Sequence, residues 1–265
     1  MTGLSEPRLL HCKGVQKYYG AMAAVNNLTV EVRPGEVLGI GGPNGAGKTT
    51  LFDVVSGLTV ADAGEILLDG QNIMGARPEH ICHLGLARTF QLNAGFDSLT
   101  VRQNVLIGAY FGYRNRILPG LRFGRKDMTR ADEALELVGM RQKANEIVKD
   151  MPVLDRKLLM IASALASNPK ILLLDEPVGG LNPHEIDDIL ALLRKLCDLG
   201  ITIVLIEHVM RFLMQLATRV MIMHHGEMIY EGPPAGLIRD KNVVDVYLGE
   251  GASSRLEKFL VEGDG

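Results

Sequence analysis

The sequence lacks the cysteine pairs that hold zinc or cross-link secreted domains. Its 265 residues contain three cysteines, Cys12, Cys82 and Cys197, and no two of them form a CxxC pair. This pattern argues against a zinc site and is typical of a protein from a reducing compartment. We therefore interpret the three thiols as small hydrophobic side chains that pack in the interior.

The chain also lacks long apolar runs and an excess of positive charge. No run approaches the roughly 18–20 apolar residues needed to span a bilayer, and we expect no secretory signal in the opening MTGLSEPRLLHC. The formal net charge of −3 gives no general attraction to nucleic acid or to anionic lipid. We expect a cytosolic protein that binds no nucleic acid, and docking to a membrane protein stays open.

A glycine-rich stretch that follows a short apolar run is the strongest motif of the chain. Residues 37–40 predict a buried strand, and Gly42 to Thr49 reads GxxxxGKT, the pattern of a phosphate-binding loop. Glycines let the backbone approach phosphate oxygens, and the start of the next helix presents partial positive charge to an anion. Lys48 can reach the β- and γ-phosphates, and the Thr49 hydroxyl can bind Mg²⁺. The expected nucleotide-binding residues are Gly42, Pro43, Asn44, Gly45, Ala46, Gly47, Lys48, Thr49 and Thr50.

Short strands and hairpins are predicted on both sides of this loop. Residues 8–35 have the texture of antiparallel strands. Residues 65–73 and 219–231 predict hairpins that turn at Asp69-Gly70 and at His225-Gly226. Tyr19 precedes the loop and is a candidate to stack on a purine ring, whereas half-buried strand aromatics are the alternative for Tyr18 and Tyr19.

Helices and buried strands alternate through the second half of the chain. Helical spacing predicts four helices, over residues 100–111, 131–149, 153–166 and 184–198. Asn182-Pro183 is expected to begin the last of them, and Gly200 to end it. Buried strands are predicted over residues 170–176 and 201–206. This alternation predicts an α/β fold with a parallel sheet and right-handed crossovers.

Residues 113–130 differ from their surroundings because they are basic. Tyr113, Phe123 and leucines are interleaved with Arg114, Arg116, Arg122, Arg125, Lys126 and Arg130. A solvated basic loop or short helical hairpin is one interpretation, and a surface near phosphate headgroups or a membrane partner is another. Nucleic-acid binding ranks third because the chain as a whole is not basic.

Two adjacent carboxylates, Asp175 and Glu176, end the buried strand predicted over residues 170–176. In ATPases with a phosphate-binding loop the strand-end aspartate holds Mg²⁺, which assigns Asp175 to the metal. Glu176 is then placed to polarise the attacking water. A solvated turn would explain the pair without function, but a phosphate loop in the same chain favours the functional interpretation.

The order of these motifs resembles the nucleotide-binding subunit of ABC transporters over about residues 9–249. In that resemblance GPNGAGKT is the Walker A motif and ILLLDE is the Walker B motif, with Glu176 as its catalytic glutamate. It also implies that Tyr19 stacks on adenine, that Gln91 is the glutamine of the Q-loop and that His208 is the switch histidine. The stretches ARTFQ, IEHVM and VYLGE are similar, more narrowly, to the branched-chain amino-acid uptake ATPases.

The resemblance implies a fold and a domain organisation. We expect a P-loop NTPase with a RecA-like parallel-sheet core, an antiparallel β subdomain and an inserted helical subdomain over about residues 93–168. These parts form one nucleotide-binding domain of residues 8–250, and a short tail of residues 251–265 follows it. Such a protein binds and hydrolyses ATP on the cytoplasmic face of the membrane, where it couples hydrolysis to uptake of a small solute.

The resemblance also implies site residues and partners. The expected catalytic residues are Glu176, His208 and Gln91, and Thr49, Gln91 and Asp175 are expected to hold the Mg²⁺ that accompanies ATP. The expected partners are integral-membrane permease subunits, a second ATP-binding subunit and, indirectly, an extracytoplasmic solute-binding protein. The solute itself stays open, because the residues that contact it lie in other subunits.

One motif departs from the family pattern. Family members carry the signature LSGGQ, and two subunits pair head to tail so that each signature faces the γ-phosphate bound by the other. Here the five positions read Met151, Pro152, Val153, Leu154 and Asp155. Pro152 offers neither a hydroxyl nor an N–H, and Asp155 adds negative charge. We infer an asymmetric pair, in which a different subunit with an intact signature completes the ATP site of this chain.

Two other function classes compete with this interpretation. In a regulatory module without a transport role, the nucleotide would only control association; the altered signature favours this alternative, whereas intact Glu176 and His208 argue against it. A soluble member of the superfamily acting in DNA repair or translation would carry two cassettes or a long coiled insertion, and the chain has neither.

Overall fold

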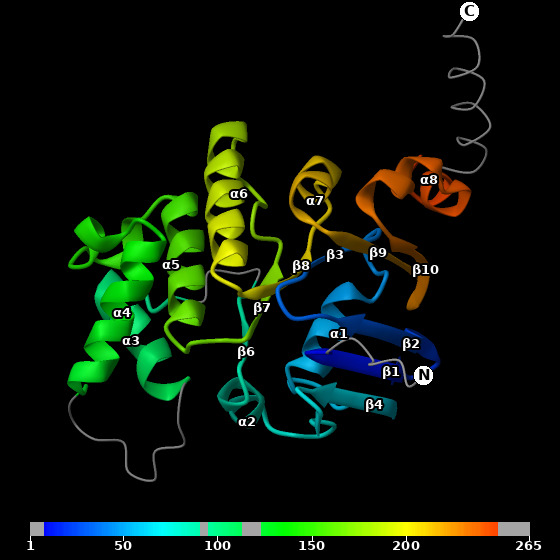
Figure 1. Ribbon diagram of the computed structural model, residues 1–265, viewed down its shortest axis with the longest axis horizontal. Helices are drawn as coiled ribbons and strands as arrows, with labels where there is room; N and C mark the ends of the chain where they lie inside the picture. Colours follow the sequence, from blue (N-terminus) through cyan, green and yellow to red (C-terminus); the bar gives the residue numbers. More distant parts are fainter. Residues whose placement is uncertain (1–7, 91–94, 113–122, 249–265) are drawn as a thin grey trace, which may run out of the picture.

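The computed structural model describes residues 8–90, 95–112 and 123–248 (Figure 1). Gln91, the first part of the basic segment and the tail of residues 251–265 lie outside this range. Two sheets, eight α-helices and three 3₁₀ turns make up the described chain. Within these residues no helix is both long enough and apolar enough to cross a membrane.

A six-stranded sheet forms the centre of the molecule. Its strand order is β10-β9-β3-β8-β7-β6, and all neighbours are parallel except β10, which pairs antiparallel with β9. The strands are β3 (Val37–Gly41), β6 (Leu86–Arg88), β7 (Ile171–Asp175), β8 (Thr202–Ile206), β9 (Arg219–His224) and β10 (Glu227–Gly232). Because β3, β7 and β8 are buried on both faces, they read as continuous apolar runs rather than as alternating ones.

A smaller antiparallel sheet packs beside this centre, in the order β2-β1-β4-β5. Its strands are β1 (Leu10–Tyr19), β2 (Met22–Val32), β4 (Ala63–Leu68) and β5 (Gln71–Asn72). The turn between β4 and β5 has φ values of 49° at Asp69 and 76° at Gly70, which confirms the predicted hairpin. The hairpin of β9 and β10 is confirmed in the same way at His225 and Gly226.

The helices fall into groups that cover different parts of the sheets. They are α1 (Lys48–Val55), α2 (Pro78–His83), α3 (Val101–Phe111), α4 (Arg125–Leu137), α5 (Val153–Leu165), α6 (Pro183–Asp198), α7 (Met210–Leu216) and α8 (Lys241–Leu248). Short 3₁₀ turns are η1 (Arg141–Lys143), η2 (Val148–Asp150) and η3 (Pro234–Arg239). In Figure 1 α1 lies between the two sheets, and α3, α4 and α5 form a separate bundle to the side.

Alternate residues of the central strands fill two cores. Leu172, Leu174 and Leu205 belong to the core shared with α6, α7 and the bundle of α3, α4 and α5. Leu173 and Val204 point the other way, into the core that α1 shares with the antiparallel sheet. The fold agrees with the expected parallel core, antiparallel β subdomain and inserted helices.

The helix predicted over residues 131–149 is wrong in both of its ends. The structure has α4 over Arg125–Leu137 instead. It starts earlier because the backbone N–H of Gly124 donates to Oδ2 of Asp127 at 2.9 Å, which caps the first turn. It ends earlier because Gly139, with φ of 75°, takes a left-handed conformation, after which the chain continues as η1 and η2. The last six residues of the basic segment, 125–130, therefore belong to a helix.

The other helix ends match their sequence signals. The side chain of Asn182 accepts hydrogen bonds from the backbone N–H groups of His184 and Glu185, at 3.0 and 3.1 Å, and Pro183 is the first residue of α6. Gly200, with φ of 83°, follows the end of that helix. These local caps fix the direction in which α6 leaves the edge of the sheet that carries Asp175 and Glu176.

Candidate functional site

The phosphate-binding loop joins the end of β3 to α1, as its sequence predicts. Its glycines are required by geometry. At Gly42, φ is 140° and a Cβ would lie 2.2 Å from the carbonyl oxygen of Met223; at Gly47, φ is 98° and a Cβ would lie 2.0 Å from that of Ala24. The backbone N–H of Gly226 also donates to the carbonyl of Ala46 at 3.0 Å. The loop is thus held tightly between β2 and the β9–β10 turn, with α1 starting at its end.

Lys48 is the first residue of α1, and its side chain folds back over the loop. Its Nζ donates hydrogen bonds to the carbonyl oxygens of Gly42 and Pro43, at 2.8 and 3.0 Å. The residue is only 8% exposed, and this burial lowers the pKa of its ammonium group, while Glu176 and Asp175 act in the opposite direction. A cation is therefore held over the loop at the point where an anion would enter.

Several of the predicted nucleotide contacts are accessible. Asn44, Gly45 and Thr49 are exposed on the surface of the loop, and Thr50 is half-buried behind it. Tyr19 ends β1 with 48% of its surface exposed, and Nζ of Lys17 lies 5.5 Å from the centroid of its ring. Its ring is available for stacking, as expected. The half-buried alternative is wrong for both tyrosines, because Tyr18 is exposed as well.

Asp175 lies at the carboxyl end of β7, and its carboxylate is buried. Oδ2 accepts a hydrogen bond from Nη2 of Arg88 at 3.2 Å, whereas Oδ1 has no hydrogen-bond partner among the described residues. Burial raises the pKa of this carboxyl, and the Arg88 guanidinium acts against that rise. An oxygen that is buried and without a partner fits a hard cation.

The donors on either side of the loop suit magnesium better than other metals. The Thr49 hydroxyl and the Asp175 carboxylate are oxygen ligands, and Mg²⁺ is bound through one or two such groups together with substrate phosphates. No group of three or more His, Cys, Asp or Glu side chains in the described chain has the arrangement of a self-contained metal site. The residues present therefore fit a metal that arrives with a nucleotide.

Glu176 and His208 face each other across the ends of β7 and β8. Nδ1 of His208 lies 3.6 Å from Oε1 of Glu176. The backbone of Glu176 is anchored at both ends, because its N–H donates to the carbonyl of Ile206 at 3.0 Å and its carbonyl accepts from Nζ of Lys157 at 2.7 Å. Four predicted site residues thus lie together at one edge of the central sheet, the edge formed by the carboxyl ends of its parallel strands: Lys48, Asp175, Glu176 and His208. Gln91 lies outside the described residues.

Sequence reasoning missed two buried charged residues at this edge. Glu207 is fully buried, and its carboxylate accepts hydrogen bonds from the backbone N–H groups of Val178, His208 and Val209 at 3.0 to 3.2 Å. Burial raises the pKa of this carboxyl, and the backbone donors lower it. Glu207 thereby fixes the backbone that carries His208. The second residue is Arg88, and nothing in the stretch ARTFQ indicates that its side chain is buried beside Asp175.

The altered signature lies at the start of α5. Pro152 precedes the helix, with no side-chain cap, and Val153 is exposed at its first position. Asp155 is buried, and its Oδ2 lies 2.5 Å from Nζ of Lys143. The negative charge expected from Asp155 is thus paired with the positive charge of Lys143. What remains missing relative to the family pattern is the hydroxyl and the glycine backbone.

Known proteins are similar to this chain along most of its length. The profile of the ABC transporter family matches residues 25–179. The high-affinity branched-chain amino acid transport ATP-binding protein LivG of Escherichia coli (strain K12) is 34% identical over 257 residues, covering 93% of this chain and 100% of LivG.

Solved structures agree with the sequence comparison. A crystal structure of the ADP conformation of an ATP-binding cassette from an ABC transporter has a TM-score of 0.84 and 28% identity, covering 92% of this chain and 99% of that one. A dimeric cassette bound to ADP and Pi in a post-hydrolysis state has a TM-score of 0.74 and 26% identity, covering 85% and 98%.

Proposed function

Because the chain belongs to the ABC transporter family, we propose that it is the ATP-hydrolysing subunit of an importer for branched-chain amino acids or a related amino acid or amide. One observation carries the proposal: Lys48, Asp175, Glu176 and His208 converge on one edge of the central sheet beside a phosphate-binding loop. The similarity to LivG along the full chain supports the class of solute. The relatives give no support to a regulatory module without a transport role.

Each residue at this edge has a distinct proposed task. The loop from Gly42 to Thr50 binds the phosphates of ATP, with Lys48 on the β- and γ-phosphates, and Tyr19 stacks on the adenine. Thr49 and Asp175, assisted by Gln91, would hold Mg²⁺, which when bound neutralises charge on the phosphates.

The water that attacks the γ-phosphate is prepared by this chain. Glu176 takes a proton from the water as its oxygen bonds to phosphorus, and the bond to the ADP oxygen breaks. His208 donates a hydrogen bond towards the γ-phosphate and keeps Glu176 oriented across the 3.6 Å that separate Nδ1 from Oε1. Glu207 supports this arrangement by fixing the His208 backbone.

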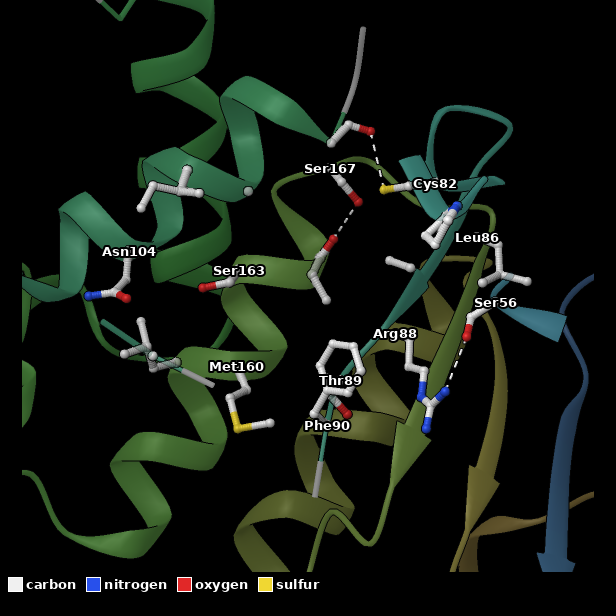
Figure 2. A pocket seen from close by; sticks show the side chains of 18 of the residues that line it. Ser56, Cys82, Leu86, Arg88, Thr89, Phe90, Asn104, Met160, Ser163 and Ser167 are labelled. Atoms are coloured by element: carbon white, nitrogen blue, oxygen red, sulfur yellow. Dashed lines mark hydrogen bonds between the residues drawn. The ribbon is translucent and has the colours of Figure 1, made fainter. Parts of the chain in front are cut away.

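The permease subunits need a surface on which to dock, and the chain offers an apolar groove. A cavity of about 330 Å³ opens between α2 and β6 on one side and α3 and α5 on the other (Figure 2). Leu58, Phe90 and Phe96 are exposed at the groove although they are large and apolar. We propose that a segment of the permease fills it, which places the chain on the cytoplasmic face of the membrane.

Reconstitution tests the proposed transport role. The chain is assembled in proteoliposomes with the permease and ATP-binding subunits encoded beside it, ATP is enclosed on the side of this chain, and labelled leucine uptake is measured with the matching solute-binding protein. We expect uptake that requires ATP and that disappears when Glu176 is replaced by glutamine. Leucine uptake without ATP, or transport of an unrelated solute only, would contradict the proposal.

The altered signature predicts that this chain is a poor ATPase by itself. In a homodimer both γ-phosphates would face Pro152 and Leu154 instead of a hydroxyl and a glycine amide, and the loss of one preorganised donor costs about 10²–10³-fold in rate. We expect hydrolysis to rise at least about tenfold when a partner with an intact signature is added.

A repaired variant and a control sharpen this test. In the repaired chain Pro152, Val153, Leu154 and Asp155 become Ser, Gly, Gly and Gln, and we expect its homodimer to gain activity. Asp155→Asn is the control, because it removes only a charge that Lys143 already compensates, and it should leave the homodimer slow. Fast, cooperative hydrolysis by the unmodified chain alone would disprove the asymmetric pair.

A further inference from the structure

We propose that Arg88 is a positioning residue that orients Asp175 for the metal. The inference rests on the proposed magnesium site and adds to it a residue that neither the motifs nor the family comparison assigns. Arg88 ends β6, which pairs in parallel with β7 so that Arg88 lies beside Leu173 in the register, near the carboxyl end where Asp175 follows. Its side chain is only 5% exposed.

The guanidinium of Arg88 holds two carboxylates from different elements. Nη2 donates to Oδ2 of Asp175 at 3.2 Å, and Nη1 donates to Oδ1 of Asp53, on α1, at 2.7 Å. Nη1 also lies 3.1 Å from Oγ of Ser56. Asp53 and Ser56 thus hold the Nη1 end of the Arg88 guanidinium, a fork of two nitrogens, against α1, the helix that follows the phosphate loop. The other end meets Asp175, so that β6, β7 and α1 are locked together through one planar group.

Aromatic side chains hold the plane of the guanidinium. The carbon Cζ lies 5.5 Å from the centroid of the Phe52 ring and 5.1 Å from that of Phe90. An arginine that lies near two aromatic rings and is bonded at both ends of its fork has few other orientations. Its contact with Oδ2 therefore sets the rotation of the Asp175 carboxylate, which leaves Oδ1, the buried oxygen without a described partner, as the atom for the metal.

Arg88 also lies between the proposed ATP site and the apolar groove proposed to bind the permease. Figure 2 shows Arg88 and Phe90 on the wall of the cavity, with the guanidinium directed towards Ser56. Contacts made in the groove against Phe90 would thus act on the stack that orients Arg88. Lysine cannot replace it, because an ammonium is a point charge without the fork that spans two carboxylates.

Metal binding in the absence of turnover tests this role. In a Glu176→Gln parent, the affinity for a fluorescent ATP analogue is measured without metal and with saturating Mn²⁺, and the electron paramagnetic resonance spectrum of bound Mn²⁺ reports its ligand geometry. Saturating Mn²⁺ raises the affinity for the analogue by a certain factor in the parent, and Arg88→Lys should make that factor smaller by about tenfold or more. This is the usual effect of losing a residue that bonds to a metal ligand. Affinity without metal should stay within about threefold, and the Mn²⁺ spectrum should change.

Arg219→Lys is the matched control. Arg219 is likewise largely buried and bonded through Nε and Nη2 to Glu36, at 2.7 and 3.0 Å, but it starts β9 at the opposite edge of the sheet. We expect it to lower stability and leave the Mn²⁺ effect unchanged. Equal losses of the Mn²⁺ effect in both variants, or an unchanged Mn²⁺ effect and spectrum in folded Arg88→Lys, would overturn the inference.

A second variant covers the case in which Arg88→Lys does not fold. Asp53→Ala keeps Arg88 and Asp175 but removes the carboxylate that anchors Nη1 on α1, and it should reduce the Mn²⁺ effect in the same direction by a smaller factor. An unchanged Mn²⁺ effect in this variant would then overturn the role. A parent protein whose ATP affinity shows no response to Mn²⁺ would instead disprove the proposed metal site, so the two failures are distinguishable.

Discussion

Replacing Glu176 with glutamine should slow ATP hydrolysis by about 10²–10⁴-fold while ATP affinity changes by less than about threefold. Glutamine has the same shape as glutamate, so it preserves the contact with His208 across the ends of β7 and β8. It cannot accept a proton from the attacking water, and for that reason the chemical step alone should fail. The measurement is single-turnover hydrolysis by the assembled transporter, with nucleotide binding followed separately.

Glu185→Gln is a suitable control for this experiment. This variant makes the same chemical change in the first turn of α6. The Glu185 side chain accepts a hydrogen bond from the backbone N–H of Asn182 at 2.8 Å, and no contact with the nucleotide is proposed for it. We expect that variant to keep its turnover. Normal turnover in the Glu176 variant would remove the general-base assignment and leave the residue a structural role.

The second large effect is expected at the phosphate loop. Lys48→Ala should abolish tight ATP binding, because it removes the cation that the structure holds over the loop and that we propose contacts the β- and γ-phosphates. At about 4 Å and an effective dielectric constant near 20, one such charge pair contributes about 4 kcal/mol, or about 10³-fold in affinity. Lys48→Met separates the loss of charge from the loss of side-chain volume and should behave alike. Equilibrium binding of ATP measures both variants.

Lys170→Met provides the control for the loss of a positive charge. Lys170 precedes β7 at the far edge of the sheet, where its Nζ pairs with Asp69, so its removal should leave ATP affinity unchanged. If Lys48→Ala kept its affinity within about threefold, a shift of under 1 kcal/mol, the assignment of the site would be wrong.

Features set by short stretches of sequence could be predicted. The turn at Asp69-Gly70 and the cap at Asn182 each depend on neighbours within a few residues, so the local pattern contains the whole physical cause. The buried strand ending in Asp175 was predicted for the same reason, since apolar character along five residues determines its burial on both faces. The loop from Gly42 to Thr49 was predicted from its residue pattern, although the contacts that require glycine at positions 42 and 47 come from the distant residues Met223 and Ala24.

Features set by contacts between distant segments could not be predicted. Arg88 matters because β6 lies next to β7 and its side chain reaches Asp53 on α1. The residues around position 88 give no sign of its bonds to Asp53 and Asp175. The ion pair of Asp155 with Lys143, twelve residues away, is a similar case, because the sequence showed the negative charge at the signature but not its partner. The early start of α4 is different, because its cap is local: Asp127 lies three residues from Gly124, and the prediction missed this signal.

The backbone of Glu176 adopts a conformation that is unfavourable for most residues other than glycine. Glu176 has φ of 49°, a left-handed conformation that costs a residue with a Cβ about 1 kcal/mol and costs glycine nothing. Mutation to glycine or asparagine would therefore relax the strand end and stabilise the fold while silencing the ATPase. The stability of the fold therefore does not explain a glutamate at this position, whereas the proposed role in ATP hydrolysis does.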